Sequence, residues 1–313
     1  MSSGAANPFL SKHEAVCPEH LLTLAGNNKP ARTAIVRAGS SLPMQAAKDA
    51  CDIGIMEPVF VGEKPDIEAI AKELDWDISS YEIHDTCGEE EAAQAAALLG
   101  NQGKVDVIMK GNLHTDTFMG ALIKRDTGIR TASRLVHVFY ITDPVEQRPL
   151  IVCDGAVNVT PDIKTRQAAI VAVDQLARAT GIERPKIALL SATESAIPSV
   201  PSSMEAAELQ SWAQENIPTS DVRGPLALDL ILSQDSAMTK GLADDPVAGK
   251  ADAVVVPDIV SGNALFKSLV YIGGGCAAGI VMGGKIPVLL TSRADPPAAR
   301  LASAALASIM RDK

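Results

Sequence analysis

The sharpest chemical pattern in the sequence lies near the C-terminus, where residues 291–295 (TSRAD) directly follow the apolar run 287–290. Arginine binds tetrahedral oxyanions through paired N–H donors, and a hydroxyl beside it can donate a further hydrogen bond. Ser292 and Arg293 therefore suit a site for phosphate or a polarised carbonyl, with a surface ion pair as an equal alternative for Arg293. Asp295 fits either a general base or the N-cap of the helix that follows, and aspartate is more often a cap at such a position.

A second polar loop, residues 110–116 (KGNLHTD), directly follows the apolar run 105–109. Lys110 and His114 flank the expected start of a helix, whose N-terminal N–H groups attract anions. The structural alternative is that Thr115 or Asp116 caps this helix and that His114 bonds to a backbone carbonyl. The helix should turn its apolar residues inward and end at a glycine; these are Phe118, Met119, Leu122, Ile123 and Gly128.

The glycine-rich segment 271–284 (YIGGGCAAGIVMGG) suggests a dinucleotide-binding turn but lacks the context of one. No long strand precedes it, and no acidic residue follows a second strand at the expected distance. We expect its glycines to permit close packing, and Cys276 to be a small buried residue rather than a nucleophile. The sequence contains no HExxH or P-loop pattern, so no metal site is predicted.

The composition is globular: 313 residues, 47% of them hydrophobic and 21% charged, with a formal net charge of −10. A chain this acidic is not expected to bind nucleic acid, because a phosphate backbone requires clustered Lys and Arg. Five cysteines without a CxxC pair favour free thiols in a reducing compartment. We see no basic-then-apolar leader and no membrane-length apolar run, so we expect a cytoplasmic protein without a membrane partner.

Short, almost continuously apolar runs alternate with Ala-rich segments of helical spacing, which is typical of an α/β fold with mainly parallel strands. The expected strands are 33–37, 58–61, 105–109, 136–141, 150–153, 186–190, 253–256 and 287–290. The clearest helix should start at Thr160-Pro161-Asp162, with Thr160 as cap, and end at Gly181. Residues 221–236 begin like a turn and continue as a helix. Since ligands bind at the carboxyl ends of such strands, the loops that follow them are the predicted site.

These loops, in this order, resemble the phosphate acetyl/butyryltransferases. The matching segments are MKGNLHTDTFMGALI, DGAVNVTPD, ESAIPSVPSSMEAAEL, GPLALD, PVAGKADAVVVPDIVSGNALFK and IPVLLTSRAD, and the similarity runs from about residue 30 to the C-terminus. The closest branch is the transferase half of bifunctional enoyl-CoA hydratase/phosphate acetyltransferase proteins.

The resemblance implies a two-domain fold like that of the isocitrate/isopropylmalate dehydrogenases. Each domain would be an α/β/α sandwich, with the active site in the interdomain cleft. Domain I would comprise residues 1–140 plus 283–313, and domain II the inserted residues 141–282, which would mediate a homodimer.

The implied reaction is acyl-CoA plus phosphate giving acyl phosphate plus CoA, with a short acetyl or butyryl group. It needs neither a metal nor a cofactor other than CoA as substrate. Ser292 matches the serine that stabilises the transition state, and Arg293 the phosphate-binding arginine. Arg130 matches a basic position that can also hold phosphate. Four further positions match polar motif residues for which a structural role is at least as plausible: Asn158, Asp258, Asn263 and Lys267.

The sequence departs from the family pattern at four positions. Ala299 stands where the acetyltransferase branch has an aspartate base, and Gly155, Gly120 and Cys276 replace a cysteine, an arginine and an aspartate. The base is therefore open, with Asp295 a candidate only by its nearness. Two alternatives remain: a catalytically weak relative that binds acyl-CoA, and an NAD-linked dehydrogenase of the same fold.

Overall fold

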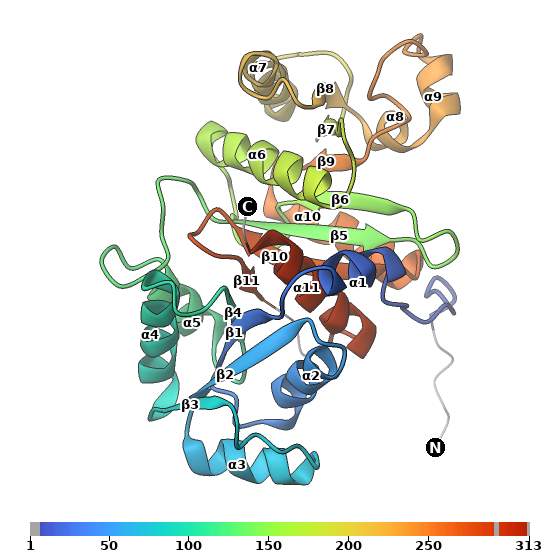
Figure 1. Cartoon of the computed structure of the whole chain (residues 1–313). Helices are drawn as coiled ribbons and strands as arrows, with labels where there is room; N and C mark the ends of the chain where they lie inside the picture. The colour runs from blue at the N-terminus through green and yellow to red at the C-terminus, as the bar shows by residue number, and fades with distance from the viewer. Residues whose placement is uncertain (1–6, 291–293, 312–313) are drawn as a thin grey trace. The chain divides into compact units, whose positions relative to one another are not determined.

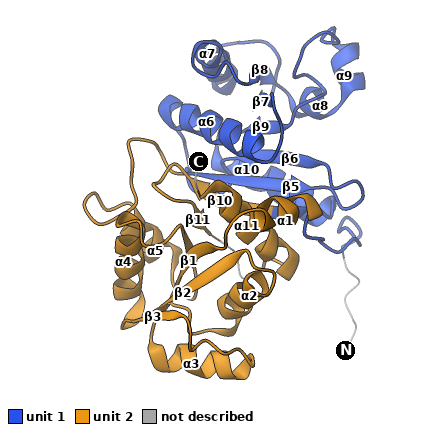
Figure 2. Cartoon of the chain, in the orientation of Figure 1, with its two compact units in different colours: residues 1–18, 136–277 blue, residues 19–135, 278–313 orange. Residues whose placement is uncertain are grey.

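The computed structural model describes residues 7–290 and 294–311. Its helices and strands are labelled in Figure 1. The chain divides into two compact units, which Figure 2 shows in different colours. Unit 1 consists of Met1–Pro18 and Val136–Ala277, and unit 2 of Glu19–Leu135 and Ala278–Lys313. Both units are mixed α/β structures, as the sequence predicts.

Unit 2 contains a sheet in which strands β3, β2, β1, β4 and β11 run parallel in that order, and β10 joins β11 in the antiparallel direction. Its strands are β1 (Ala31–Val36), β2 (Met56–Gly62), β3 (Glu82–Asp85), β4 (Val107–Lys110), β10 (Cys276–Met282) and β11 (Val288–Leu289). Its helices are α1 (Glu19–Gly26), α2 (Ser41–Asp52), α3 (Lys64–Glu73), α4 (Gly88–Asn101), α5 (Thr115–Leu122) and α11 (Pro297–Met310). Helices α1 and α2 pack against α11, and α4 packs against α5.

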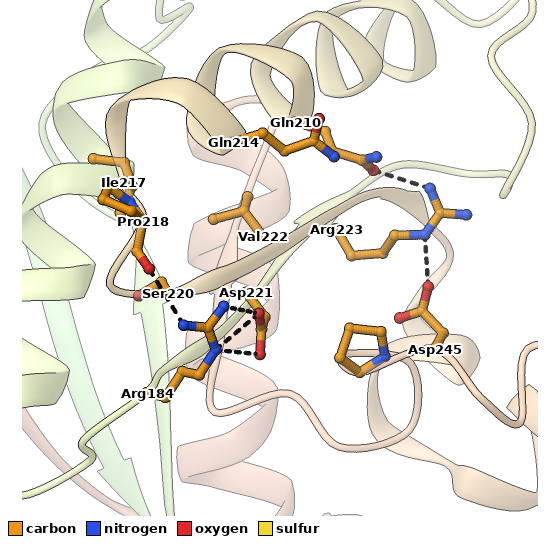
Figure 3. Close-up of a pocket in the computed structure, with 11 residues that line it drawn as sticks. Arg184, Gln210, Gln214, Ile217, Pro218, Ser220, Asp221, Val222, Arg223 and Asp245 are labelled. Carbon is orange, nitrogen blue, oxygen red and sulfur yellow. Dashed lines mark hydrogen bonds and ion pairs between the residues drawn. The ribbon is translucent and has the colours of Figure 1, made fainter.

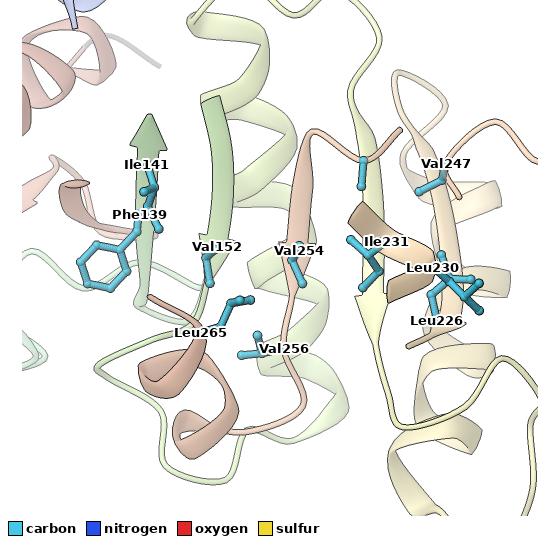
Figure 4. Packing of buried hydrophobic residues seen from close by; sticks show 12 residues of the cluster. Phe139, Ile141, Val152, Leu226, Leu230, Ile231, Val247, Val254, Val256 and Leu265 are labelled. Atoms are coloured by element: carbon cyan, nitrogen blue, oxygen red, sulfur yellow. The ribbon is translucent and has the colours of Figure 1, made fainter. Parts of the chain in front are cut away.

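Unit 1 contains strands in the order β5, β6, β9, β7 and β8, all parallel except β5 against β6. The strands are β5 (Val136–Thr142), β6 (Pro149–Cys153), β7 (Lys186–Leu190), β8 (Asp221–Leu226) and β9 (Ala253–Val255). The helices are α6 (Ile163–Ala179), α7 (Pro201–Asn216), α8 (Leu228–Leu232), α9 (Gln234–Thr239), α10 (Ile259–Lys267) and the π-helix η1 (Ser268–Ile272). Buried side chains of β5, β6 and β9, such as Val152 and Val254, pack with Leu265 of α10 (Figure 4).

All eight predicted strands are confirmed within a few residues, because each is a continuous apolar run that the structure buries. Residues 221–236 were predicted to begin as a turn and continue as a helix; they begin instead as strand β8, and the predicted helical part follows as α8 and α9. Strand β8 contains Gly224-Pro225. It tolerates Gly224-Pro225 because it lies at the edge of its sheet, where one side of the ladder is unpaired. Strand β3 was not predicted because its four residues are polar or half-exposed. Strand β10 was missed because its glycine-rich flanks obscured it.

Three predicted helix starts are shifted in the structure. Asp162, rather than Thr160, is the N-cap of α6, and its carboxylate accepts the Thr165 N–H at 2.7 Å. Helix α5 has His114 at its N-cap position, so neither Thr115 nor Asp116 caps it, and it ends at Leu122 rather than at Gly128. The N-cap of α11 is Pro296, so the capping interpretation of Asp295 is wrong. The predicted end of α6 at Gly181, with φ of 98°, is confirmed.

Candidate functional site

The carboxyl ends of β1, β4 and β11 meet at one edge of the unit 2 sheet. Val36 pairs with Lys110, and Leu289 pairs with Met109 in the same parallel ladder. The strand that leads toward Ser292 and Arg293 therefore ends beside the strand that leads into the Lys110 loop. Ser292 and Arg293 themselves lie outside the described residues.

The loops after β1 and β4 pack backbone against backbone. Gly111 donates its N–H to the Val36 carbonyl at 2.9 Å, and Asn112 donates to the Arg37 carbonyl at 3.1 Å. A Cβ at position 111 would lie 2.2 Å from the Val36 oxygen, so only glycine fits this approach. Arg37 itself has a left-handed backbone with φ of 53°. The two loops are thus held in a fixed mutual position at the strand ends.

A group of charged side chains that sequence reasoning missed connects these loops to the start of α4. Glu89 accepts hydrogen bonds from the backbone N–H of His114 at 2.9 Å and from Arg37 Nη1 at 3.0 Å, and its Oε2 lies 2.9 Å from His114 Nδ1. Arg37 Nε lies 3.6 Å from Glu63 Oε1, in the loop after β2. The structural alternative for His114, a bond from its ring to a backbone carbonyl, is wrong because the ring pairs with the Glu89 carboxylate. The only sequence signal for Glu89 was its place in the acidic first turn of a helix.

Both acidic members of this group are held in the ionised form. Hydrogen bonds from the backbone N–H and the ring of His114 lower the pKa of Glu89, and the charge of Arg37 adds to the effect. Burial raises the pKa of Glu63, but hydrogen bonds from its own N–H and from Gly88, together with Arg37, outweigh burial and leave the pKa below its usual value. The group therefore carries two carboxylates and one guanidinium at neutral pH.

The other predicted residues of unit 2 have simpler surroundings. Thr115 is exposed in the first turn of α5, directly after His114. Arg130 is exposed, and its backbone forms an antiparallel bridge with Gly284. The backbone carbonyl of Asp295 accepts a hydrogen bond from Arg300. Ala299, at the position of the family's aspartate base, is buried in α11.

In unit 1, the loop after β6 is organised by Asp154, which sequence reasoning did not single out. Its buried carboxylate accepts the backbone N–H groups of Ala156, Val157 and Asn158 at 2.9, 3.0 and 3.3 Å, and the Asn158 side-chain amide at 2.6 Å. Asn158 is thus tied to its own loop.

His137 lies beside Asp154 in the unit 1 sheet and is almost completely buried. Val138 pairs with Cys153 in the antiparallel ladder of β5 and β6, so His137 is across from Asp154. Within the described part of the chain, neither ring nitrogen of His137 has a hydrogen-bond partner. Burial lowers the pKa of His137 to about 4, although the charge of Asp154 opposes this shift.

The remaining predicted residues of unit 1 lie on α10 or at its start. Asp258 is the N-cap, and its carboxylate accepts the N–H and the hydroxyl of Ser261 at 2.9 and 3.0 Å. Asn263 donates its side-chain amide to the Gly155 carbonyl at 3.3 Å. Lys267, one helical turn further on, is exposed. Asp258 and Asn263 therefore have structural partners, whereas Lys267 presents a cation at the surface.

Two predictions about small residues are confirmed. Cys276 is buried, and burial raises the pKa of its thiol to about 12, with Cys17 adding to the effect, so it is no thiolate nucleophile. The glycines of residues 271–284 allow close approach: a Cβ on Gly283 would lie 2.1 Å from the Arg134 oxygen. At Gly155 a Cβ would lie 2.9 Å from the Phe139 ring, which accounts for glycine where the family pattern has cysteine.

A pocket of about 450 Å³ opens beside edge strand β8 in unit 1, and none of the predicted residues lines it (Figure 3). Its two guanidinium groups are already paired: Arg184 with Asp221 and Arg223 with Asp245, at 2.6 and 2.9 Å. A bound anion would have to compete with these carboxylates, so the pocket is a poor phosphate site.

Among the described residues, no group of three or more His, Cys, Asp or Glu is placed to hold a metal ion. None of the helices in the described ranges combines the length and the apolar character needed to cross a membrane.

Comparison with protein families gives a match over most of the chain. The family described as phosphate acetyl/butaryl transferase matches residues 89–308. A phosphate acetyltransferase of Rickettsia typhi is 36% identical over 293 residues, which are 93% of this chain and 84% of that protein. A phosphate butyryltransferase of Clostridium acetobutylicum is 35% identical over 280 residues, covering 89% of this chain and 93% of the relative.

Among solved structures, the fold is similar to that of a branched-chain phosphotransacylase from Enterococcus faecalis V583. The TM-score is 0.77 at 29% sequence identity, and the match covers 89% of this chain and 98% of the other. The matched sequence includes both polar loop regions, residues 110–116 and 154–158, and extends beyond residue 295.

Proposed function

We propose that this chain, which belongs to the phosphate acetyl/butaryl transferase family, moves a short acyl group between coenzyme A and inorganic phosphate. The observation that carries the proposal is the family match, which extends over more than half of the chain and includes the loops that follow β4, β6 and β11. The reaction is acyl-CoA plus phosphate giving acyl phosphate plus CoA, by direct transfer without a metal. The dehydrogenase alternative is set aside, because the family is one of acyltransferases.

In this proposal, Arg293 binds phosphate and Ser292 donates a hydrogen bond to the oxyanion that forms at the acyl carbonyl. The register of β11 beside β4 supports a joint site, because it brings the strand before Ser292 to the edge that carries Lys110. Lys110, Thr115 and the exposed Arg130 supply further donors and positive charge for phosphate. Asp295 is assigned to the same site because it lies two positions after Arg293 in the sequence.

For unit 1 we propose a contribution to CoA binding. CoA carries several phosphate groups, and the exposed ammonium of Lys267 suits one of them. Asn158, Asn263 and Asp258 would shape the loop and the start of α10 that face the ligand. The two-domain dehydrogenase-like arrangement, the homodimer and the cytoplasmic location belong to this proposal as well.

A second candidate is a relative that binds acyl-CoA without turning it over. The observation behind it is Ala299, which leaves the family's base position with a buried methyl group. The two candidates differ in whether CoA is released.

The deciding experiment measures thiol release from acyl-CoAs of two to six carbons, with and without phosphate. Phosphate-dependent release with at least one of them supports the enzyme, and binding without release supports the second candidate. Arg293→Ala should raise the KM for phosphate more than the KM for acyl-CoA. The matched control is Arg178→Ala, which removes an exposed arginine in the last turn of α6. An unchanged phosphate KM in Arg293→Ala would remove that residue from its role.

A further inference from the structure

The side chain of His114 is held by one ring nitrogen and exposed at the other end. Nδ1 lies 3.0 and 2.9 Å from the two carboxylate oxygens of Glu89, while the side chain as a whole is 85% exposed. The backbone N–H of the same residue also binds Glu89. With both contacts on the Nδ1 side, Nε2 faces away from the carboxylate. A neutral imidazole that donates from Nδ1 carries its basic lone pair on Nε2.

The carboxylate that orients His114 is itself fixed. Arg37 Nη1 donates to Glu89 at 3.0 Å and also lies 3.4 Å from the Asn112 carbonyl, in the same loop as His114. Glu63 contacts the other side of Arg37. The same arrangement of carboxylate and histidine sets the tautomer and stabilises the imidazolium in hydrolytic triads.

We propose that His114 Nε2 accepts the thiol proton of CoA during acyl transfer, with Glu89 and Arg37 as positioning residues. The inference rests on the proposed function and fills the role left open by Ala299. In the direction of CoA acylation, the S–H bond breaks and its proton moves to Nε2. The sulfur electron pair then forms the S–C bond to the carbonyl carbon of acyl phosphate. The C–O bond to phosphate breaks, the leaving phosphate keeps its electron pair, and the imidazolium later releases the proton to phosphate or water.

The elements around this histidine carry further charged groups. Arg37 follows β1, Glu63 follows β2 and Lys110 ends β4. Glu90 and Glu91 lie in the first turn of α4, and Asp116 in that of α5. Glu89 differs from the other carboxylates in touching the ring directly.

The test compares the pH profile of acyl-CoA formation from acyl phosphate and CoA in the wild-type chain, His114→Gln and Glu89→Gln. A positioned base contributes about 10²- to 10⁴-fold, so His114→Gln should lower kcat by that factor near pH 7. The deficit should shrink as the pH passes the thiol's own pKa of about 8.5, where the thiolate forms without help. Glu89→Gln should lower kcat with little change in the KM for CoA, because the ring loses the carboxylate that orients it but keeps its own contacts with substrate.

The matched control is Glu90→Gln, which removes one carboxylate from the same helical turn at an exposed position. It should keep the wild-type profile. Equal circular dichroism spectra and melting temperatures would show that the variants are folded. A pH-independent loss in His114→Gln, or no loss, overturns the proton-acceptor role alone. A wild-type chain that forms no acyl-CoA overturns the proposed function and this inference with it.

Discussion

The loops after the parallel strands of unit 2 and unit 1 occupy equivalent places in their sheets but use their charged residues differently. In unit 2, Arg37, Glu89 and His114 come from three separate segments, and the histidine remains exposed. In unit 1, the carboxylates of Asp154 and Asp258 accept hydrogen bonds from backbone N–H groups of their own segments. A polar residue at a strand end is therefore only a candidate for the functional site. Its hydrogen-bond partners decide between a chemical and a structural role.

The largest effect on stability should come from Asp154→Ala in unit 1. It leaves four hydrogen bonds unmade at a buried loop, so we expect the free energy of unfolding to fall by about 3 kcal/mol. Urea unfolding followed by circular dichroism measures the change. Glu89→Ala in unit 2 is the comparison, with an expected loss of about 1 kcal/mol or less because its ion pairs are partly exposed. Equal losses would break the contrast between the two units.

The buried His137 of unit 1 should make stability depend on pH. Its pKa is about 4 in the folded chain and 6.5 in the unfolded chain, so the unfolded chain binds the proton first as the pH falls. Stability should therefore decrease from about pH 6.5 down to about pH 4, by about 3 kcal/mol in total, and then level off.

His137→Phe should remove that slope, because phenylalanine fills a buried site without a titrating group. The control His13→Gln changes an exposed histidine and should retain the slope. The measurement is urea unfolding at intervals between pH 4 and 7. If His137→Phe kept the full slope, another group would be responsible for it.

A smaller effect tests whether Asp258 only caps α10 or also acts on the ligand. Loss of this N-cap in Asp258→Ala should cost about 1 kcal/mol, whereas Asp258→Ser keeps a capping oxygen and should be nearly as stable as the wild-type chain. If the residue only caps, the serine variant also keeps the KM for acyl-CoA. A raised KM in Asp258→Ser would show that the charge of Asp258 acts on the ligand. The contrast between structural carboxylates in unit 1 and chemical ones in unit 2 would then fail for this residue.

The sequence predicted the eight apolar strands and the polar loops at their ends. Both leave a local pattern, because a strand buried on both faces is a continuous apolar run and the loop after it contains glycine and polar residues. The sequence could not predict that Glu89 contacts both Arg37 and His114, since Glu89 lies 52 positions after Arg37 and 25 positions before His114. Only the folded arrangement of β1, β4 and α4 brings the three residues together. The sequence also could not distinguish Asp154 from other loop aspartates. That distinction depends on the carboxylate accepting hydrogen bonds from residues 156 to 158 of its own loop. Helix starts were misplaced for a related reason, because several adjacent residues are all good caps.

Arg37 offers the finest test of unit 2, because it combines ion pairs with a left-handed backbone. Arg37→Met removes the ion pairs and keeps the backbone strain, whereas Arg37→Gly removes both. A non-glycine residue is destabilised by about 1 kcal/mol in this conformation. The glycine variant should therefore be the more stable of the two, by less than that amount because glycine loses more conformational entropy on folding. Both should slow CoA acylation, because Glu89 loses its partner in either case. Equal stabilities with unequal rates would show that the backbone conformation, rather than the guanidinium, positions the carboxylate.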